Sequence, residues 1–282
     1  MRLGINTFLF ACPFHNQHTR LFPKFRKWGF KSVEIAVADP GDMNPAYVRD
    51  QLDEHGLVAA TLCGAFGPGR DLRGTPAEQQ ASSDYIKALI GQMEILGCTV
   101  LGGPLYSSVG RAEAETPANQ RAQRKLVVRH LRELAAYAGD RGVTLCVEPL
   151  NRFETDLLNT CDQALDLVAD VGHPALKVHL DTFHMNIEEK DLGAAIRRCG
   201  QHLGLLHASG SDRGTPGTDH IDWKGIAAAL RAIKFQGDVV IESFTQDVEI
   251  IARAAAIWRR IEPTQDEIAA KGAKFLRKLL KV

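Results

Sequence analysis

Four residues that could bind a metal ion close four short aliphatic runs in the second half of the sequence. The runs TLCVE, KVHLD, LLH and VVIE end in Glu148, Asp181, His207 and Glu242. Carboxylates packed together repel one another unless a cation neutralises them. Three carboxylates and one imidazole, with no thiolate, favour Mn²⁺, Mg²⁺ or Co²⁺ over a structural zinc ion. If the fold brings these residues together, we expect them to bind one divalent metal ion.

The runs also predict how these side chains are positioned. Side chains alternate between the two faces of a strand, and in a closed barrel one face points to the interior and the other to the surrounding helices. In residues 144–148 the alternation places Glu148 inward, and in residues 177–181 it places His179 and Asp181 inward. Active sites of such barrels lie at the C-terminal ends of the strands. The four residues are therefore expected to converge on one mouth of a barrel.

Short runs rich in β-branched and aliphatic residues alternate with longer amphipathic stretches along the whole chain. The expected strands are residues 3–8, 32–37, 58–63, 99–102, 144–148, 177–181, 204–208 and 239–242. The expected helices are residues 19–28, 45–55, 77–96, 118–141, 161–171, 192–201, 223–233 and 248–260. Eight such pairs favour an α/β fold, a single (β/α)8 TIM barrel domain over residues 1–282, with an extra C-terminal helix, 265–280, in an extension from about residue 263. A doubly wound open sheet is the alternative, but the sequence lacks the GxGxxG turn or P-loop that usually follows an early strand there.

The composition is typical of a globular protein and argues against several partners. The 282 residues include 34 Lys+Arg and 34 Asp+Glu, so the net charge is +0 and no broad basic face for nucleic acid is expected. No apolar run approaches the roughly 20 residues that span a membrane. The start, MRLGINTFLF, is typical of a first strand rather than of a signal peptide. The 6 cysteines form no CxxC pair, which favours a reduced, cytoplasmic protein without a thiolate zinc cluster.

Four longer segments resemble a known family. VEPLNRFET (147–155), HLDTFHMNIEE (179–189), HASGSDRGTPG (207–217) and VIESF (240–244) are similar to segments of the ketose 3-epimerases of the D-tagatose and D-allulose (D-psicose) type. These enzymes belong to the sugar phosphate isomerase/epimerase superfamily, whose fold is a xylose isomerase-like TIM barrel. The resemblance covers nearly the whole chain in strand order and is most specific in the C-terminal half.

The resemblance implies a cofactor, roles for individual residues and an assembly. One divalent metal ion per subunit, Mn²⁺ with Co²⁺ or Mg²⁺ as alternatives, would be bound by the four residues identified above. Glu148 and Glu242 would also be the two catalytic bases, on opposite faces of the ketose substrate. The side chains that match the family's substrate contacts are Glu154, His184, Arg213, Phe8 and Phe244. The family further implies a homodimer or homotetramer.

Several residues also have an ordinary structural interpretation. His184 could cap a helix that begins near residue 186. Arg213 could be a solvated loop charge, and Glu154 could be a surface carboxylate. Glu34, in the run SVEIAV, points inward in the same sense and could hydrogen-bond near the site or be purely structural. His179 is expected to be satisfied by Lys177 or by carboxylates deeper in the barrel.

These observations predict divalent-metal-dependent epimerisation of free ketoses at C3, such as D-fructose/D-allulose, D-tagatose/D-sorbose or L-ribulose/L-xylulose. One glutamate would remove the C3 proton to give a cis-enediolate, and the other would return a proton to the opposite face. The alternatives on the same barrel are an isomerase or epimerase of a phosphorylated sugar or of hydroxypyruvate, an inosose-type dehydratase, an AP endonuclease-type hydrolase and a barrel without enzymatic activity. Residues 10–18 and 64–74 are expected to contact C4–C6 of the sugar, and they do not identify the preferred ketose.

Overall fold

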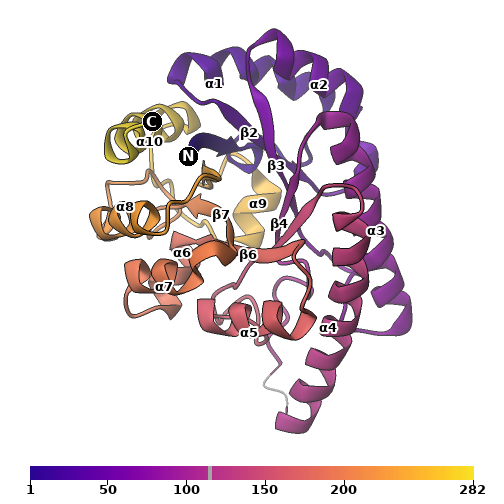
Figure 1. Cartoon of the computed structure of the whole chain (residues 1–282). Coiled ribbons are helices and arrows are strands. Elements are labelled where there is room, and N and C mark those ends of the chain that lie inside the picture. The colour runs from indigo at the N-terminus through magenta and orange to yellow at the C-terminus, as the bar shows by residue number, and fades with distance from the viewer. Residues whose placement is uncertain (114–115) are drawn as a thin grey trace.

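The computed structural model describes residues 1–113 and 116–282. In this part of the chain the strands pair in parallel and in chain order, and the last pairs with the first, so that the sheet closes into a barrel (Figure 1). The strands are β1 (Arg2–Asn6), β2 (Ser32–Val37), β3 (Val58–Gly64), β4 (Val100–Gly103), β5 (Thr144–Val147), β6 (Leu176–Asp181), β7 (Leu203–Ala208) and β8 (Asp238–Ile241). The barrel predicted from the alternating pattern is confirmed.

Helices surround the barrel (Figure 1). They are α1 (Phe22–Trp28), α2 (Pro45–Glu54), α3 (Pro76–Leu96), α4 (Pro117–Gly139), α5 (Cys161–Val171), α6 (Thr182–Glu188), α7 (Leu192–Cys199), α8 (Trp223–Ala232), α9 (Glu249–Ala254) and α10 (Gln265–Leu280). Thr75, Thr116 and Thr160 cap three of them by accepting a hydrogen bond from the backbone N–H three residues further on. None of the helices in the described ranges is both long and apolar enough to cross a membrane.

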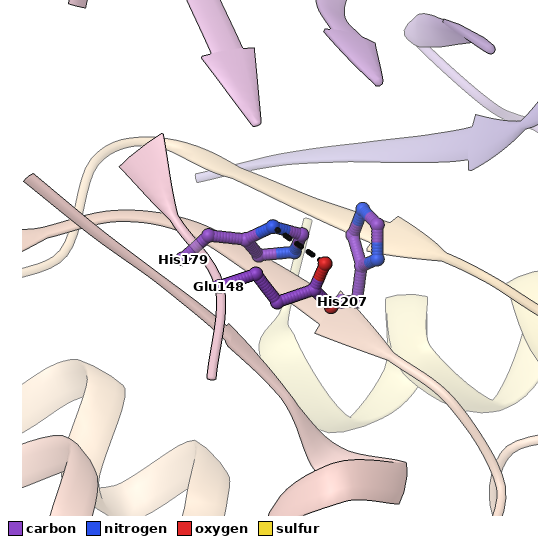
Figure 2. A group of neighbouring side chains, drawn as sticks. All are labelled: Glu148, His179 and His207. Carbon is purple, nitrogen blue, oxygen red and sulfur yellow. Dashed lines mark ion pairs between the residues drawn. The ribbon is translucent and has the colours of Figure 1, made fainter. Parts of the chain in front are cut away.

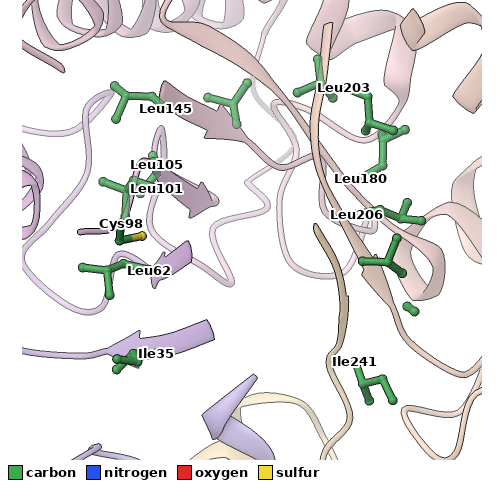
Figure 3. Packing of buried hydrophobic residues seen from close by; sticks show 14 of the residues in the cluster. Ile35, Leu62, Cys98, Leu101, Leu105, Leu145, Leu180, Leu203, Leu206 and Ile241 are labelled. Carbon is green, nitrogen blue, oxygen red and sulfur yellow. The ribbon is translucent and has the colours of Figure 1, made fainter. Parts of the chain in front are cut away.

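The main hydrophobic core lies between the strands and the helix layer (Figure 3). Side chains from β2, β3, β5 and β8 are fully buried in it, namely Ile35, Leu62, Leu145 and Ile241. Burying each such side chain contributes about 1.5–3 kcal/mol to stability. Because strand side chains alternate, this outward packing directs the intervening residues to the barrel interior.

The end of the chain closes the helix layer. The prediction of one helix over residues 248–260 was too long, because only Glu249–Ala254 is helical. Ile251 of this short α9 packs with Phe244 in a small separate apolar cluster, outside the main core. The outer position next to β8 and β1 is occupied by α10, which packs against α1 and α8. Phe275 of α10 lies edge-on to Trp223, with ring centroids 5.9 Å apart.

Two local differences from the prediction concern the site. Glu148 and Glu242 directly follow β5 and β8 instead of ending them. A short helix, α6, begins immediately after β6, where Asp181 is its N-cap and accepts a hydrogen bond from the Phe183 backbone N–H at 2.7 Å. His184 therefore lies within a helix and does not cap one.

Candidate active site

The four residues expected to bind a metal ion lie together inside the C-terminal mouth of the barrel. Glu148, Asp181, His207 and Glu242 each place one ligand atom so that all four atoms lie within 4.8 Å of one another. His207 Nδ1 is 3.4 Å from an oxygen of Glu242 and 4.0 Å from an oxygen of Asp181. All four side chains are buried, with exposed fractions of 6% or less. The barrel thus assembles residues that are far apart in the sequence.

This donor set fits a divalent cation. Two of its atoms, Glu148 Oε1 and His207 Nδ1, are buried and have no hydrogen-bond partner within residues 1–113 and 116–282. Buried polar atoms without a partner are uncommon in proteins. A bound ion would satisfy both atoms, replace any proton on the imidazole nitrogen, and offset the repulsion among three buried carboxylates.

Glu34 orients the imidazole of His207. Its carboxylate accepts hydrogen bonds from His207 Nε2 at 2.7 Å and from Asn6 Nδ2 at 2.6 Å, and a further one from the Thr61 hydroxyl. Because Nε2 is engaged, Nδ1 is the nitrogen that faces the carboxylates. Asn6 also donates to Glu242 at 3.1 Å, so it links the two carboxylates. A carboxylate behind a ligating histidine is a common way to fix its tautomer and ring orientation.

The carboxyl groups of the site differ in acidity. Burial raises the pKa of Glu148 well above its ordinary value of 4.5. Burial likewise raises the pKa of Asp181 to about 6, although the positive charge of Arg213 opposes this. On Glu242 burial acts in the same direction, but His207 and Arg213 outweigh it and lower the pKa to about 2. The surroundings thus shift the pKa values of Glu148 and Glu242 in opposite directions, a separation that general acid–base catalysis uses.

Arg213 is not a solvated loop charge but is buried in the site. Its guanidinium donates to Asp181 at 2.7 Å and to Glu242 at 3.0 Å. The guanidinium carbon lies 4.0 Å from the ring centroid of Phe183 and 4.6 Å from that of Phe244, which are favourable cation–π distances. Its backbone has a positive φ of 65°. This tight loop conformation places the charge against the carboxylates.

Asn151 holds two of the residues matched to substrate contacts. Its backbone N–H donates to His184 Nδ1 at 3.0 Å, and its side-chain amide donates to Glu154 at 2.8 Å. The second ring nitrogen of His184, Nε2, consequently points toward the site, where it lies 3.9 Å from Glu148 Oε1. The sequence shows Asn151 only as part of NRFET, with no periodic signal that would single it out.

A cavity of about 520 Å³ opens above these residues. Its size is within the usual range for small-molecule sites. Its lining includes both glutamates and every residue matched to a substrate contact, namely Glu148, Glu242, Glu154, His184, Arg213, Phe8 and Phe244. Of the two early segments expected to contact C4–C6, residues 65–68 and Arg70 line the cavity, and residues 10–18 are absent from the lining. Residues Ile250 and Ile251 of α9 complete the apolar rim.

A second histidine, His179, lies next to the four-residue group. Its ring meets that of His207 edge-on, with centroids 4.0 Å apart, and the Glu148 carboxylate points toward the two rings (Figure 2). The expected partner Lys177 does not hydrogen-bond to it. Instead, both ring nitrogens of His179 lack a hydrogen-bond partner in the part of the chain that the structure describes.

Comparisons with known proteins identify the family of this chain. Residues 22–279 match the family described as Xylose isomerase-like TIM barrel. The chain is 33% identical to a "Probable ketose 3-epimerase" of Synechocystis, over 98% of this chain and 96% of that protein. It is also 33% identical to a "D-psicose 3-epimerase" of Enterocloster bolteae, over 97% and 93%. A crystal structure of D-psicose 3-epimerase from Clostridium cellulolyticum with D-tagatose superposes with a TM-score of 0.89 at 30% identity, covering 99% of both chains. The family resemblance predicted from the sequence motifs is confirmed.

Proposed function

We propose that this chain, which belongs to the xylose isomerase-like TIM barrel family, is a divalent-metal-dependent isomerase that epimerises free ketoses at C3. The observation that carries the proposal is the placement of Glu148 and Glu242. Both face the cavity, and both contribute to the same buried four-residue group. Similarity to proteins named ketose 3-epimerase and D-psicose 3-epimerase supports the reaction class.

The residues that would hold the ion are Glu148, Asp181, His207 and Glu242. A divalent ion bound there would supply Lewis acidity to the oxygens beside the reacting carbon. The oxygen-rich donor set supports Mn²⁺, with Co²⁺ or Mg²⁺ as alternatives.

The two glutamates would move the protons. C3 of a ketose is next to the C2 carbonyl, so its C–H bond is weakly acidic. In one direction the Glu242 carboxylate takes the C3 proton. The bonding electrons then pass to the carbonyl oxygen and give a cis-enediolate. Glu148 then returns a proton to the opposite face of C3 as the carbonyl re-forms. Two carboxyl groups are needed because inversion without rotation of the substrate requires a proton acceptor on one face of C3 and a proton donor on the other.

Other side chains would orient the ketose and protect the enediolate. Arg213 places a positive charge beside Glu242, close to where negative charge develops. His184 Nε2 points toward Glu148 and could hydrogen-bond to a substrate oxygen. Phe8 and Phe244 lie edge-to-face at 6.5 Å and would keep water from one side of the cavity.

A phosphorylated substrate is less well supported. The arginines that line the cavity, within the described residues, are Arg70 and Arg213. Arg213 is already paired with two carboxylates, and Arg70 stacks on Tyr85 and donates to the Ala38 carbonyl oxygen. Arg111, which follows the cavity-lining Gly110, pairs with Asp71 and Glu113. A phosphate normally needs several free cations or a helix N-terminus.

The test is turnover of the Mn²⁺-loaded protein on D-fructose, D-allulose, D-tagatose and L-ribulose, each beside its phosphate ester where one exists. We expect C3 epimers of free ketoses as products, and loss of turnover in Glu148→Gln and Glu242→Gln. The exposed carboxylate Glu94 offers a matched control, Glu94→Gln, which should leave turnover unchanged. A preference for phosphate esters, or a product lighter by one water, would contradict the proposal in favour of the sugar-phosphate or dehydratase alternative.

The proposed setting is the cytoplasm, with a homodimer or homotetramer as the working assembly. The free cysteines support a reducing compartment. Light scattering on the purified chain would determine the assembly.

A further inference from the structure

A second group of possible metal ligands overlaps the first. Glu148, His179 and His207 also place one ligand atom each within 4.8 Å of one another (Figure 2). This group keeps two members of the four-residue site and replaces both Asp181 and Glu242 with a second imidazole. On β6, His179 precedes Asp181 by two residues on the same face, so this group lies deeper in the barrel than the catalytic site.

His179 needs a partner that the described residues do not supply. Its exposed fraction is 0%, and no hydrogen bond reaches either ring nitrogen within the described ranges. The nearest carboxylate oxygen, Glu148 Oε2, is 3.6 Å from Nδ1, which is too far for a hydrogen bond. Leaving a buried polar group unpaired costs about 1–3 kcal/mol. The ring therefore sits where a ligand would satisfy it.

The barrel makes room for this ring. A Cβ atom at Gly102 would lie 3.3 Å from His179 Nδ1 and 2.6 Å from a methyl carbon of Leu205, so the glycine on β4 keeps this space uncrowded. On the other side, Glu34 engages Nε2 of His207 and leaves its Nδ1 free. Unpartnered nitrogens of two histidines thus lie beside the Glu148 carboxylate, whose Oε2 faces His179.

We propose that Glu148, His179 and His207 form a second, deeper cation site that takes Zn²⁺. Two imidazoles and one carboxylate are a ligand set found in catalytic zinc sites, in which water occupies the fourth position. Nitrogen ligands favour Zn²⁺ over Mn²⁺, whereas the oxygen-rich group at the mouth discriminates less between them. The two sites share Glu148 and His207, so one chain holds an ion in only one of them. Zn²⁺ in the deeper site would therefore withdraw two ligands from the proposed catalytic site and inhibit it.

The binding test compares three forms of the full chain after removal of metal by a chelator. Zn²⁺ and Mn²⁺ affinities are measured by competition with a chromophoric chelator for the wild type, His179→Gln and Asp181→Asn. Without His179, Zn²⁺ can bind only at the four-residue site, so we expect His179→Gln to weaken Zn²⁺ binding by at least about 10-fold. Mn²⁺ binding should change little in His179→Gln. Asp181→Asn should weaken Mn²⁺ binding and change Zn²⁺ binding little. Equal Zn²⁺ affinity in the wild type and His179→Gln would overturn the proposal.

A second measurement uses only the wild type and does not depend on how a variant folds. Anomalous diffraction from crystals grown with Zn²⁺ should show a peak within bonding distance of His179. A peak bonded only to the four residues at the mouth would overturn the deeper site. Neither measurement reads epimerase activity, so their failure is distinct from failure of the proposed function.

Discussion

Glu34 determines which nitrogen of His207 faces the site, although it does not line the cavity. It accepts hydrogen bonds from three donors, His207, Asn6 and Thr61. We predict that Glu34→Gln weakens Mn²⁺ binding by about 10–100-fold, because an amide has one acceptor oxygen and cannot replace both carboxylate oxygens. Metal competition on the folded variant would measure this, with the exposed Asp39→Asn as control. Unchanged affinity in Glu34→Gln would mean that the carboxylate is only structural.

The residues that could be predicted from the sequence are those for which strand alternation was sufficient. Alternation placed Glu148, Asp181, His207 and Glu242 inside, and the structure brings them together. It could not identify the hydrogen-bond partners of Glu34 or show that His179 lacks them among the described residues. The register shifts at Val33/Glu34 and at Val178/His179, directly at these residues, and such irregularities depend on neighbouring strands.

Among the elements, β4 ends in a glycine that lets its backbone approach β3 closely. Gly103 has a φ of +127°, and a Cβ atom there would lie 2.0 Å from the Gly64 carbonyl oxygen of β3. We predict that Gly103→Ala lowers the free energy of unfolding by at least about 2 kcal/mol, because both the backbone conformation and the contact are unfavourable.

Chemical denaturation would measure this loss, and α3 offers a matched control. A Cβ atom at Gly91 would meet nothing within 4 Å, so Gly91→Ala should stabilise the helix by about 0.5–1 kcal/mol. Equal stability of the two variants would contradict the close approach of β3 and β4.

A buried arginine clamps the loops that follow β3, β4 and β5. Arg73 donates to Ser107 at 2.8 Å and to the Arg111 carbonyl oxygen at 2.9 Å, and it pairs with Asp156 at 2.6 Å. Partial burial alone would raise the pKa of Asp156, but the Glu113 backbone N–H and Arg73 bring it below its ordinary value of 3.8. The stability that this carboxylate contributes is therefore complete above pH 3.8 and is lost as the pH falls through the lower, folded-state pKa.

We accordingly predict that Asp156→Asn destabilises the protein at neutral pH by about 1.5–3 kcal/mol. The difference from the wild type should shrink as the pH falls below 3.8. Denaturation curves over a pH series would show this, and the exposed pair of Arg124 and Asp170 provides the control Asp170→Asn, for which little change is expected. A difference that stays constant with pH would contradict the clamp.

The sequence predicted long, capped helices better than short ones. Threonine caps and C-terminal glycines mark both ends of α3 and α5 in the sequence. The helices α6 and α9 have 7 and 6 residues, too few for a clear amphipathic period. Their positions depend on contacts with the site, which the sequence does not show.

At the scale of the whole molecule, the barrel concentrates buried negative charge at one end. Three carboxylates share the four-residue group, with exposed fractions of 6% or less. We predict that Mn²⁺ raises the midpoint of thermal unfolding and that a chelator reverses this. At an ion concentration of 100 times Kd the stabilisation should be about 2.7 kcal/mol. Asp181→Asn should abolish the response, and an equal response in that variant would place the ion elsewhere.

The most direct test of the account follows the hydrogen on C3 during turnover in D₂O. The Mn²⁺-loaded protein is incubated with a free ketose that it converts, and the C3 position of the product is examined by NMR. We predict deuterium at C3 of the epimer and no incorporation with Glu148→Gln or Glu242→Gln. Proton transfer by two glutamates would be contradicted by product that keeps its original C3 hydrogen. Proton recycling between the buried carboxyls must first be excluded by an isotope effect on the initial rate.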